Sequence, residues 1–219
     1  MNSVPIKAGM LGGTFDPIHH GHLRSALEVR EALGLDQLHM IPAPKPPLRG
    51  APQVSAEQRM ALLQAGIGTT PGLYADNREL RREGPSYSVD TLAELRAEYG
   101  EQARLVMVIG FDAFLRLPQW QQVDTLFSLA HLVVMARPGY QTPWSDELRE
   151  LVGQREVEGV DSLMQRPCGG VLLLSFPSMM AISATYIRQR LREGKSVRYL
   201  LPEAVEEAIL HKGFYQDVE

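Results

Sequence analysis

The sequence predicts an α/β fold with a doubly wound, mostly parallel sheet. Six short runs of β-branched and aliphatic residues recur along the chain, and segments with apolar residues at helical spacing lie between them. Strands that are separated by helices pair in parallel through right-handed crossovers. No internal repeat or low-complexity segment breaks the alternation, so we expect residues 1–219 to form one domain, with 183–219 as its C-terminal helical part. A chain of this size buries about 70% of its unfolded surface, so its core needs no disulfide or structural metal.

The expected strands are the short apolar runs themselves. They cover residues 6–11, 37–42, 72–76, 104–109, 131–136 and 171–175. Two loops between elements, 43–54 and 77–87, are rich in Pro, Gly and Arg. Such loops in a compact domain are typical of functional or moving segments.

Four helices are predicted from apolar spacing and from the signals at their ends. The first runs through residues 23–33 and stops at Gly34, a residue that favours left-handed backbone. Ser55 and Gln58 match a capping box at the start of the second helix. The remaining two helices, each followed by a glycine, cover residues 89–99 and 183–193.

Composition limits the possible partners and compartments. The chain has 22 Lys and Arg against 26 Asp and Glu, a formal net charge of −4, which argues against a nucleic-acid binder and makes any phosphate recognition local. Nowhere do 18 apolar residues run together, and the N-terminal apolar stretch is too short for a signal peptide, so we expect a cytoplasmic protein without a membrane partner. The single Cys168 cannot form an internal disulfide, and no Cys/His cluster suggests structural zinc. The composition carries no signal for an oligomeric state.

The segment GGTFDPIHHGHL, residues 12–23, lies where the first strand leads into the first helix. In an open parallel sheet ligands bind at such junctions, and the free N–H groups of a helix start favour anions. His19 and His22 share one face if the helix has already begun, whereas His20 points elsewhere. We consider three interpretations of this segment, which are a tight turn, a metal site and a phosphate site.

A metal held directly by these histidines is disfavoured, because a zinc site needs a third protein ligand and HExxH is absent. The spacings GxxxxGK[ST] and GxGxxG of two common phosphate-binding loops are absent as well. The pattern therefore favours a phosphate site that uses histidine where other folds use lysine. The charge of the imidazoles stays open, since a helix start disfavours imidazolium and a bound phosphate favours it.

Two segments resemble signatures of the nucleotidyltransferase superfamily. GGTFDPIHHGHL is similar to GxFxPxHxGH, and ISATYIRQRL at 182–191 is similar to ISSTxIR, with Ala184 in place of the more usual serine. The resemblance implies a Rossmann-like fold and transfer of a nucleoside monophosphate from a triphosphate with loss of pyrophosphate.

Further segments resemble one branch of that superfamily, the bacterial nicotinate-mononucleotide adenylyltransferases. They are IPAPKPPLR at 41–49, ELRREGPSYSVDTL at 79–92, IGFDAFLRLPQW at 109–120 and ARPGY at 136–140. The implied reaction converts ATP and nicotinate mononucleotide into deamido-NAD and pyrophosphate. A superfamily enzyme with a nicotinamide mononucleotide or phosphopantetheine acceptor is the alternative, and a nucleotide-binding module without activity is a distant third.

The implied reaction does not require a nucleophilic side chain. An acceptor phosphate is already an anionic nucleophile, so direct in-line attack needs alignment and charge neutralisation but no covalent enzyme intermediate. We expect Mg²⁺ to enter with the triphosphate, with no dedicated protein cage of its own.

The resemblance assigns one group of residues to ATP. The predicted catalytic residues are His19, His22 and Arg188, and the predicted ATP-binding residues are Gly12, Gly13, Thr14, Phe15, Gly110, Asp112, Ser183 and Thr185. His22 is our first choice for stabilising the transition state, and His20 has no assigned role. Taken alone, Ser183 and Asp112 would each be read as helix caps.

The resemblance assigns a second group to nicotinate mononucleotide. The pyridine ring is expected against Trp120, and its carboxylate at Ser88 and at the backbone N–H of Gln121. Candidates for the acceptor phosphate are Lys45, Arg49 and Arg137. The competing interpretations are core packing for the tryptophan and solvated loop charges for the three basic residues.

Overall fold

Six parallel strands form one sheet in the computed structural model, which describes residues 4–45, 51–136, 142–176, 178 and 180–216. The order across the sheet is β3-β2-β1-β4-β5-β6. In chain order the strands are β1 (Lys7–Gly13), β2 (Gln37–Pro42), β3 (Leu73–Ala75), β4 (Arg104–Gly110), β5 (His131–Ala136) and β6 (Val171–Ser175). The predicted doubly wound fold is confirmed, and every predicted strand is present with its ends within two residues of the expected positions.

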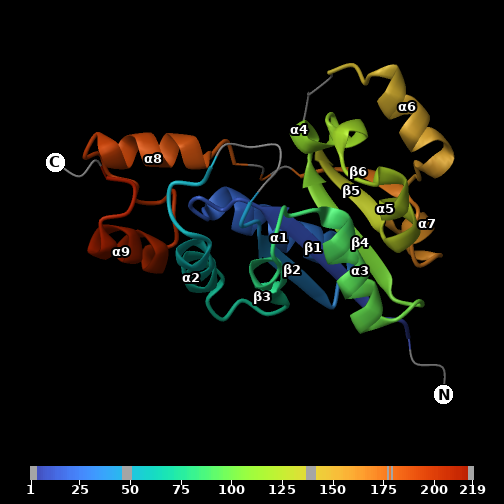
Figure 1. Cartoon of the computed structure of the whole chain (residues 1–219), viewed down its shortest axis with the longest axis horizontal. Helices are drawn as coiled ribbons and strands as arrows, with labels where there is room; N and C mark the ends of the chain where they lie inside the picture. Colours follow the sequence, from blue (N-terminus) through green and yellow to red (C-terminus); the bar gives the residue numbers. More distant parts are fainter. Residues whose placement is uncertain (1–3, 46–50, 137–141, 177, 179, 217–219) are drawn as a thin grey trace.

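Helices and 3-10 turns cover both faces of this sheet (Figure 1). Those described are α1 (His20–Leu33), α2 (Ala56–Ile67), η1 (Arg78–Arg81), α3 (Ser88–Tyr99), α4 (Phe111–Phe114), η2 (Leu117–Gln119), α5 (Val123–Leu129), α6 (Asp146–Val152), η3 (Gly153–Arg155), α7 (Val160–Met164), α8 (Ala184–Arg192) and α9 (Glu203–Lys212). All four predicted helices form as α1, α2, α3 and α8, whereas the short helices α4 to α7 and the final α9 were not predicted.

The end signals in the sequence act as expected. Gly34 has φ 60° and ends α1 by donating its N–H to the carbonyls of Arg30 and Glu31. Both halves of the capping box are present at α2, where the Ser55 side chain accepts from the Gln58 N–H and the Gln58 side chain accepts from the Ser55 N–H.

Two apolar cores lie on opposite faces of the sheet, as the alternation along β4 makes clear. Leu105, Met107 and Ile109 belong to the core beneath α3, α5 and α6, while Val106 and Val108 belong to the core beneath α1, α2 and α9. In Figure 1 the C-terminal helices α8 and α9 lie on the same side as α2, away from α3 and α5. Across the described ranges, no helix is long and apolar enough to span a bilayer.

The order of the strands positions the ligand site. The chain crosses from β1 to β2 in one direction and reaches β4, on the other side of β1, in the opposite direction. The carboxyl ends of β1 and β4 therefore border the topological switch point, where open α/β sheets bind ligands.

Candidate active site

The turn between β1 and α1 brings the first signature into a tight conformation. Gly13 ends β1, and a Cβ on it would lie 2.7 Å from the ring of Phe15, so only glycine fits there. Phe15 itself has φ 47°, a strained backbone region for a bulky residue that is typical of ligand sites. His19 is the N-cap of α1, and its Nδ1 accepts a hydrogen bond of 3.3 Å from the backbone N–H of His22.

The two signature histidines form a pair. Their rings stack with centroids 3.6 Å apart at an interplanar angle of 20°, and the ring of Phe15 meets His22 edge-on at 5.2 Å. Burial, with a smaller contribution from His20, lowers the pKa of His19 to about 4. His19 is therefore neutral at neutral pH, and because its Nδ1 accepts from the backbone, its Nε2 carries the proton that it can donate.

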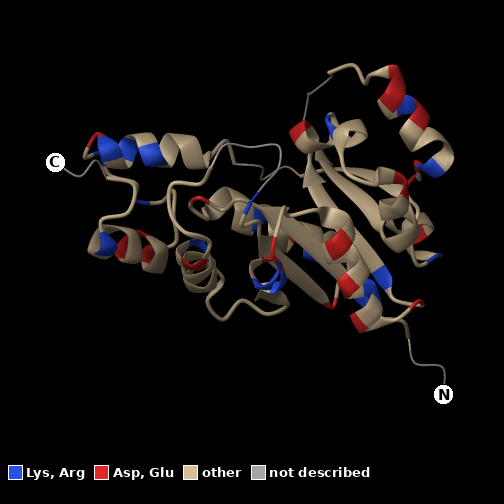
Figure 2. Ribbon diagram, in the orientation of Figure 1, with Lys and Arg blue, Asp and Glu red and all other residues tan. Residues whose placement is uncertain are grey.

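A cavity of about 560 Å³ gathers every residue that the sequence assigned to ATP. Its lining includes Gly12, Gly13, Thr14, Phe15, His19, His22, Gly110, Asp112, Ser183, Thr185 and Arg188. The starts of α1 and α8 both border this cavity, so the positive ends of two helices and the guanidinium of Arg188 face the same space, which favours an anion. Lys and Arg residues are frequent on α8 in Figure 2, and one of them, Arg188, lines the cavity.

Ser183 and Arg188 have structural contacts as well as a place in the cavity. The Ser183 hydroxyl accepts from the Tyr186 N–H at 3.2 Å, so this serine is the N-cap of α8. Arg188, one turn later, donates from Nη2 to the Thr185 hydroxyl at 3.3 Å.

A second cavity of about 450 Å³ adjoins the first and shares Gly12, Gly13, Thr14, Gly110 and Asp112 with it. Of the residues assigned to the acceptor, Ser88, Trp120 and Gln121 line it. The indole of Trp120 also packs partly on the core beneath α3 and α5, so Trp120 combines a packing contact with a place in the cavity wall. Lys45 is exposed and is not among the described residues that line this cavity, although its backbone N–H reaches the Ser86 hydroxyl at 3.4 Å. Arg49 and Arg137 lie outside the described residues.

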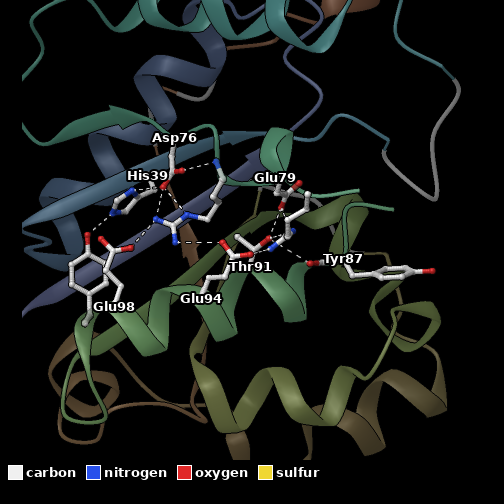
Figure 3. Close-up of polar contacts among 10 residues, drawn as sticks. His39, Asp76, Glu79, Tyr87, Thr91, Glu94 and Glu98 are labelled. Atoms are coloured by element: carbon white, nitrogen blue, oxygen red, sulfur yellow. Dashed lines mark hydrogen bonds and ion pairs between the residues drawn. The ribbon is translucent and has the colours of Figure 1, made fainter. Parts of the chain in front are cut away.

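The wall of the second cavity rests on a polar network that sequence reasoning missed. Glu79, only 5% exposed, lines the cavity and accepts a hydrogen bond of 2.7 Å from Thr91 on α3, to which Arg82 also donates at 2.6 Å (Figure 3). Burial raises the pKa of Glu79 above its ordinary value, while the hydrogen bond from Thr91 opposes that shift. The network thus fixes the 77–87 loop against α3.

The network continues away from the cavity to Asp76. Arg78 donates to this carboxylate from its backbone N–H at 2.9 Å and from Nε at 2.8 Å, and Nδ1 of His39 lies 2.8 Å from it (Figure 3). Burial alone would raise the pKa of Asp76, but the hydrogen bonds from His39 and Arg78 outweigh it and hold the pKa well below its usual range. Asp76 is therefore ionised throughout the ordinary pH range and anchors η1.

Residues 10–190 match the cytidylyltransferase-like family model. A probable nicotinate-nucleotide adenylyltransferase from Chromohalobacter salexigens is 59% identical over 211 residues, which cover 96% of each chain. The chain belongs to the nicotinate-nucleotide adenylyltransferase family. A second member of the family, from Halorhodospira halophila, is 48% identical and covers 94% of each chain. The structure of Plasmodium falciparum nicotinic acid mononucleotide adenylyltransferase complexed with NaAD is only 12% identical, yet it superposes with a TM-score of 0.70 over 96% of this chain and 97% of that one, and therefore supports the fold.

In this member of the nicotinate-nucleotide adenylyltransferase family, sequence reasoning missed three polar residues in or beside the cavity walls. Buried Glu79 lines the second cavity and buried Asp16 lines the first, while buried Arg59 donates to the carbonyl of Thr14, a residue that lines both. A signal for Asp16 was its place inside the first signature. Arg59 had a weaker signal, a basic side chain four positions after the Ser55 cap, next to the apolar residues of the same helix.

Proposed function

We propose that this chain transfers AMP from ATP to nicotinate mononucleotide and releases deamido-NAD and pyrophosphate, a step of NAD synthesis. One observation carries the proposal. Residues of two signatures that are some 160 positions apart line the first cavity. This cavity joins the second one, which Trp120 lines, through Gly110 and Asp112. Two substrates bound in the two cavities would meet at these shared residues. The same observation supports treating residues 183–219 as part of one nucleotidyltransferase domain, because Arg188 completes the site that β1 begins.

The proposed step is a direct in-line displacement. A phosphate oxygen of nicotinate mononucleotide attacks the α-phosphorus of ATP, a new P–O bond forms, and the bond from the α-phosphorus to the bridging oxygen breaks. Pyrophosphate leaves with that electron pair. No enzyme group bonds to the nucleotide, so the chain acts by alignment and by stabilising charge.

We assign the charge-stabilising roles to the first cavity. Neutral His19 donates from Nε2 to a phosphate oxygen, His22 acts on the α-phosphoryl group, and Arg188 neutralises the β- and γ-phosphates. The N–H groups at the starts of α1 and α8 add fixed positive partial charge. Gly110 and Asp112, at the start of α4, are assigned to the adenosine, with the ribose hydroxyls as partners of the carboxylate.

We assign acceptor recognition to the second cavity. The pyridine ring stacks on Trp120, and its carboxylate accepts from Ser88 and from the backbone N–H of Gln121. Lys45, Arg49 and Arg137 remain our candidates for the acceptor phosphate.

The family generally works with a divalent cation and ATP, and we propose Mg²⁺. Among the described residues no three His, Cys, Asp or Glu side chains gather as a ligand set, while the exposed carboxylate of Asp112 borders both cavities. Mg²⁺ keeps several waters and binds largely through substrate phosphates, so the ion would enter with the triphosphate while Asp112 serves the ribose. When bound, the ion neutralises phosphate charge.

Incubation of the purified chain with ATP, Mg²⁺ and nicotinate mononucleotide tests this function. We expect equimolar deamido-NAD and pyrophosphate. A parallel reaction with nicotinamide mononucleotide, and another with phosphopantetheine, identify the acceptor. If pyrophosphate is released with nicotinamide mononucleotide or with phosphopantetheine but not with nicotinate mononucleotide, the proposed acceptor is wrong. If no acceptor gives pyrophosphate release, the proposed reaction is wrong.

A further inference from the structure

Asp16, inside the first signature, lies at a junction of three distant segments. Its carboxylate is 5% exposed and accepts two hydrogen bonds, one of 2.8 Å at Oδ1 from the Tyr215 hydroxyl and one of 2.9 Å at Oδ2 from the backbone N–H of Gln53. Tyr215 is 199 residues away in the sequence, beyond α9. The phosphate-binding turn, the segment that leads into α2, and the C-terminal segment therefore meet at one carboxylate.

Two arginines border the same junction. Arg188 donates from Nη1 to the backbone carbonyl of Asp16 at 2.6 Å, and this nitrogen lies 3.8 Å from Oδ2 of the Asp16 carboxylate. Arg59, 1% exposed, donates from Nη1 to the carbonyls of Thr14 and Ala43 at 2.6 and 2.9 Å. Asp16 thus contacts the guanidinium that we assign to the triphosphate but does not form a close ion pair with it.

Tyr215 is held firmly in its place. Its side chain is 6% exposed within the core beneath α1 and α2, and its backbone has φ 63°, which a residue with a large side chain adopts only when its surroundings enforce it. Burial, followed by the charge of Asp16, raises the pKa of the phenol far above its ordinary value. The hydroxyl therefore stays protonated and donates to Asp16 at every ordinary pH.

We infer that Tyr215 is a positioning residue for ATP, which acts through Asp16 on Arg188. The hydroxyl and the Gln53 N–H occupy both oxygens of the Asp16 carboxylate. Loss of a donor leaves a buried carboxylate with an unsatisfied acceptor, and the guanidinium of Arg188, 3.8 Å away, can supply a new donor. Without the hydroxyl, Asp16 draws Arg188 into a close ion pair and away from the phosphates. This inference rests on the proposed role of Arg188.

The test is a double-mutant cycle on ATP binding, measured by titration calorimetry without acceptor. Tyr215→Phe removes only the hydroxyl, and we expect it to weaken the ATP Kd about tenfold while the KM for nicotinate mononucleotide stays unchanged. In an Arg188→Ala background the same change should alter the ATP Kd by less than about twofold. Tyr199→Phe, at a tyrosine that is 84% exposed, is the matched control and should leave the ATP Kd at the wild-type value.

A structural role alone would weaken ATP binding equally in both backgrounds, and that result, or an unchanged Kd for Tyr215→Phe, overturns the inference. Gln53→Pro is the second variant and serves even if Tyr215→Phe does not fold. It removes the other donor to Asp16 at an exposed position, and its effect on the Kd should likewise require Arg188. Adenylyl transfer by the wild-type chain is measured separately, so a failure of the proposed reaction is distinguishable from a failure of this positioning role.

Discussion

Replacement of His22 with Ala should distinguish a loss of catalysis from a loss of stability most clearly. The side chain lies in the first turn of α1, is only partly buried, and borders the cavity that we assign to ATP while it stacks on His19. Replacing it with Ala removes the donor that we assign to the α-phosphoryl group, and loss of a well-placed transition-state donor costs roughly 3 to 4 kcal/mol, or about 10² to 10³ in kcat. The lost ring contacts with His19 and Phe15 are worth about 1 kcal/mol, which corresponds to a fall in Tm of about 2 to 4 °C for a chain of this size.

Steady-state pyrophosphate release and a thermal melt on the same preparation measure the two effects. The reasoning predicts a large loss of kcat in a protein that still melts cooperatively near the wild-type temperature. A variant that unfolds at ordinary temperature while its folded fraction keeps full specific activity would refute the catalytic role and leave His22 a packing residue.

Three further changes test other parts of the structure. Trp120→Ala should raise the KM for nicotinate mononucleotide roughly three- to tenfold and leave the KM for ATP nearly unchanged, because Trp120 lines the cavity that we assign to the acceptor and not the one that we assign to ATP; equal effects on both constants would indicate core packing. Burial lowers the pKa of His19 and of His131 to about 4, against 6.5 in an unfolded chain, so the unfolded chain binds protons first. The free energy of unfolding, measured in urea, should therefore fall by up to about 3 kcal/mol per histidine as the pH drops from 6.5 to 4. In the His131→Asn variant this free energy should fall less steeply with pH. A free energy of unfolding that does not change over this range would contradict the two pKa shifts. Arg59→Met should cost about 3 to 5 kcal/mol in the same urea assay, since it removes a buried cation beside Asp16 and two hydrogen bonds to carbonyls; a cost below about 1 kcal/mol would mean that the guanidinium is dispensable.

Much of the sheet was predictable because local patterns and global fold agree there. The runs at 37–42, 131–136 and 171–175 form strands with the predicted bounds, since strands of a parallel sheet covered by helices are rich in apolar residues. Gly34 and the Ser55 capping box ended and began helices where expected, because these signals act through backbone geometry within one turn.

The short helices between β4 and β6 gave too little periodicity for prediction. For example, α4 has four residues and α7 has five, which is less than two turns in each case, so no amphipathic pattern can develop.

The helix α9, by contrast, could have been predicted. It has ten residues and is followed by Gly213, and its Val205 and Ile209 are buried one turn apart, so its signal was present in the sequence.

The candidate site also has residues that could be predicted from the sequence and residues that could not. Signature residues such as His19 and Arg188 were predictable because each signature has many defined positions, and the structure brings them to one cavity. The contact of Tyr215 with Asp16 spans 199 residues, and the support of Glu79 by Thr91 depends on how a loop folds back onto α3. Neither contact leaves a periodic or short-range trace in one sequence.

The most direct test of the division into two cavities is a crystal structure of the chain with deamido-NAD. The proposed function predicts the pyridine ring against Trp120 and the diphosphate within hydrogen-bonding distance of His22, with the ribose of the adenosine near Asp112. A dinucleotide bound in the reverse orientation, or outside the two cavities, would contradict it.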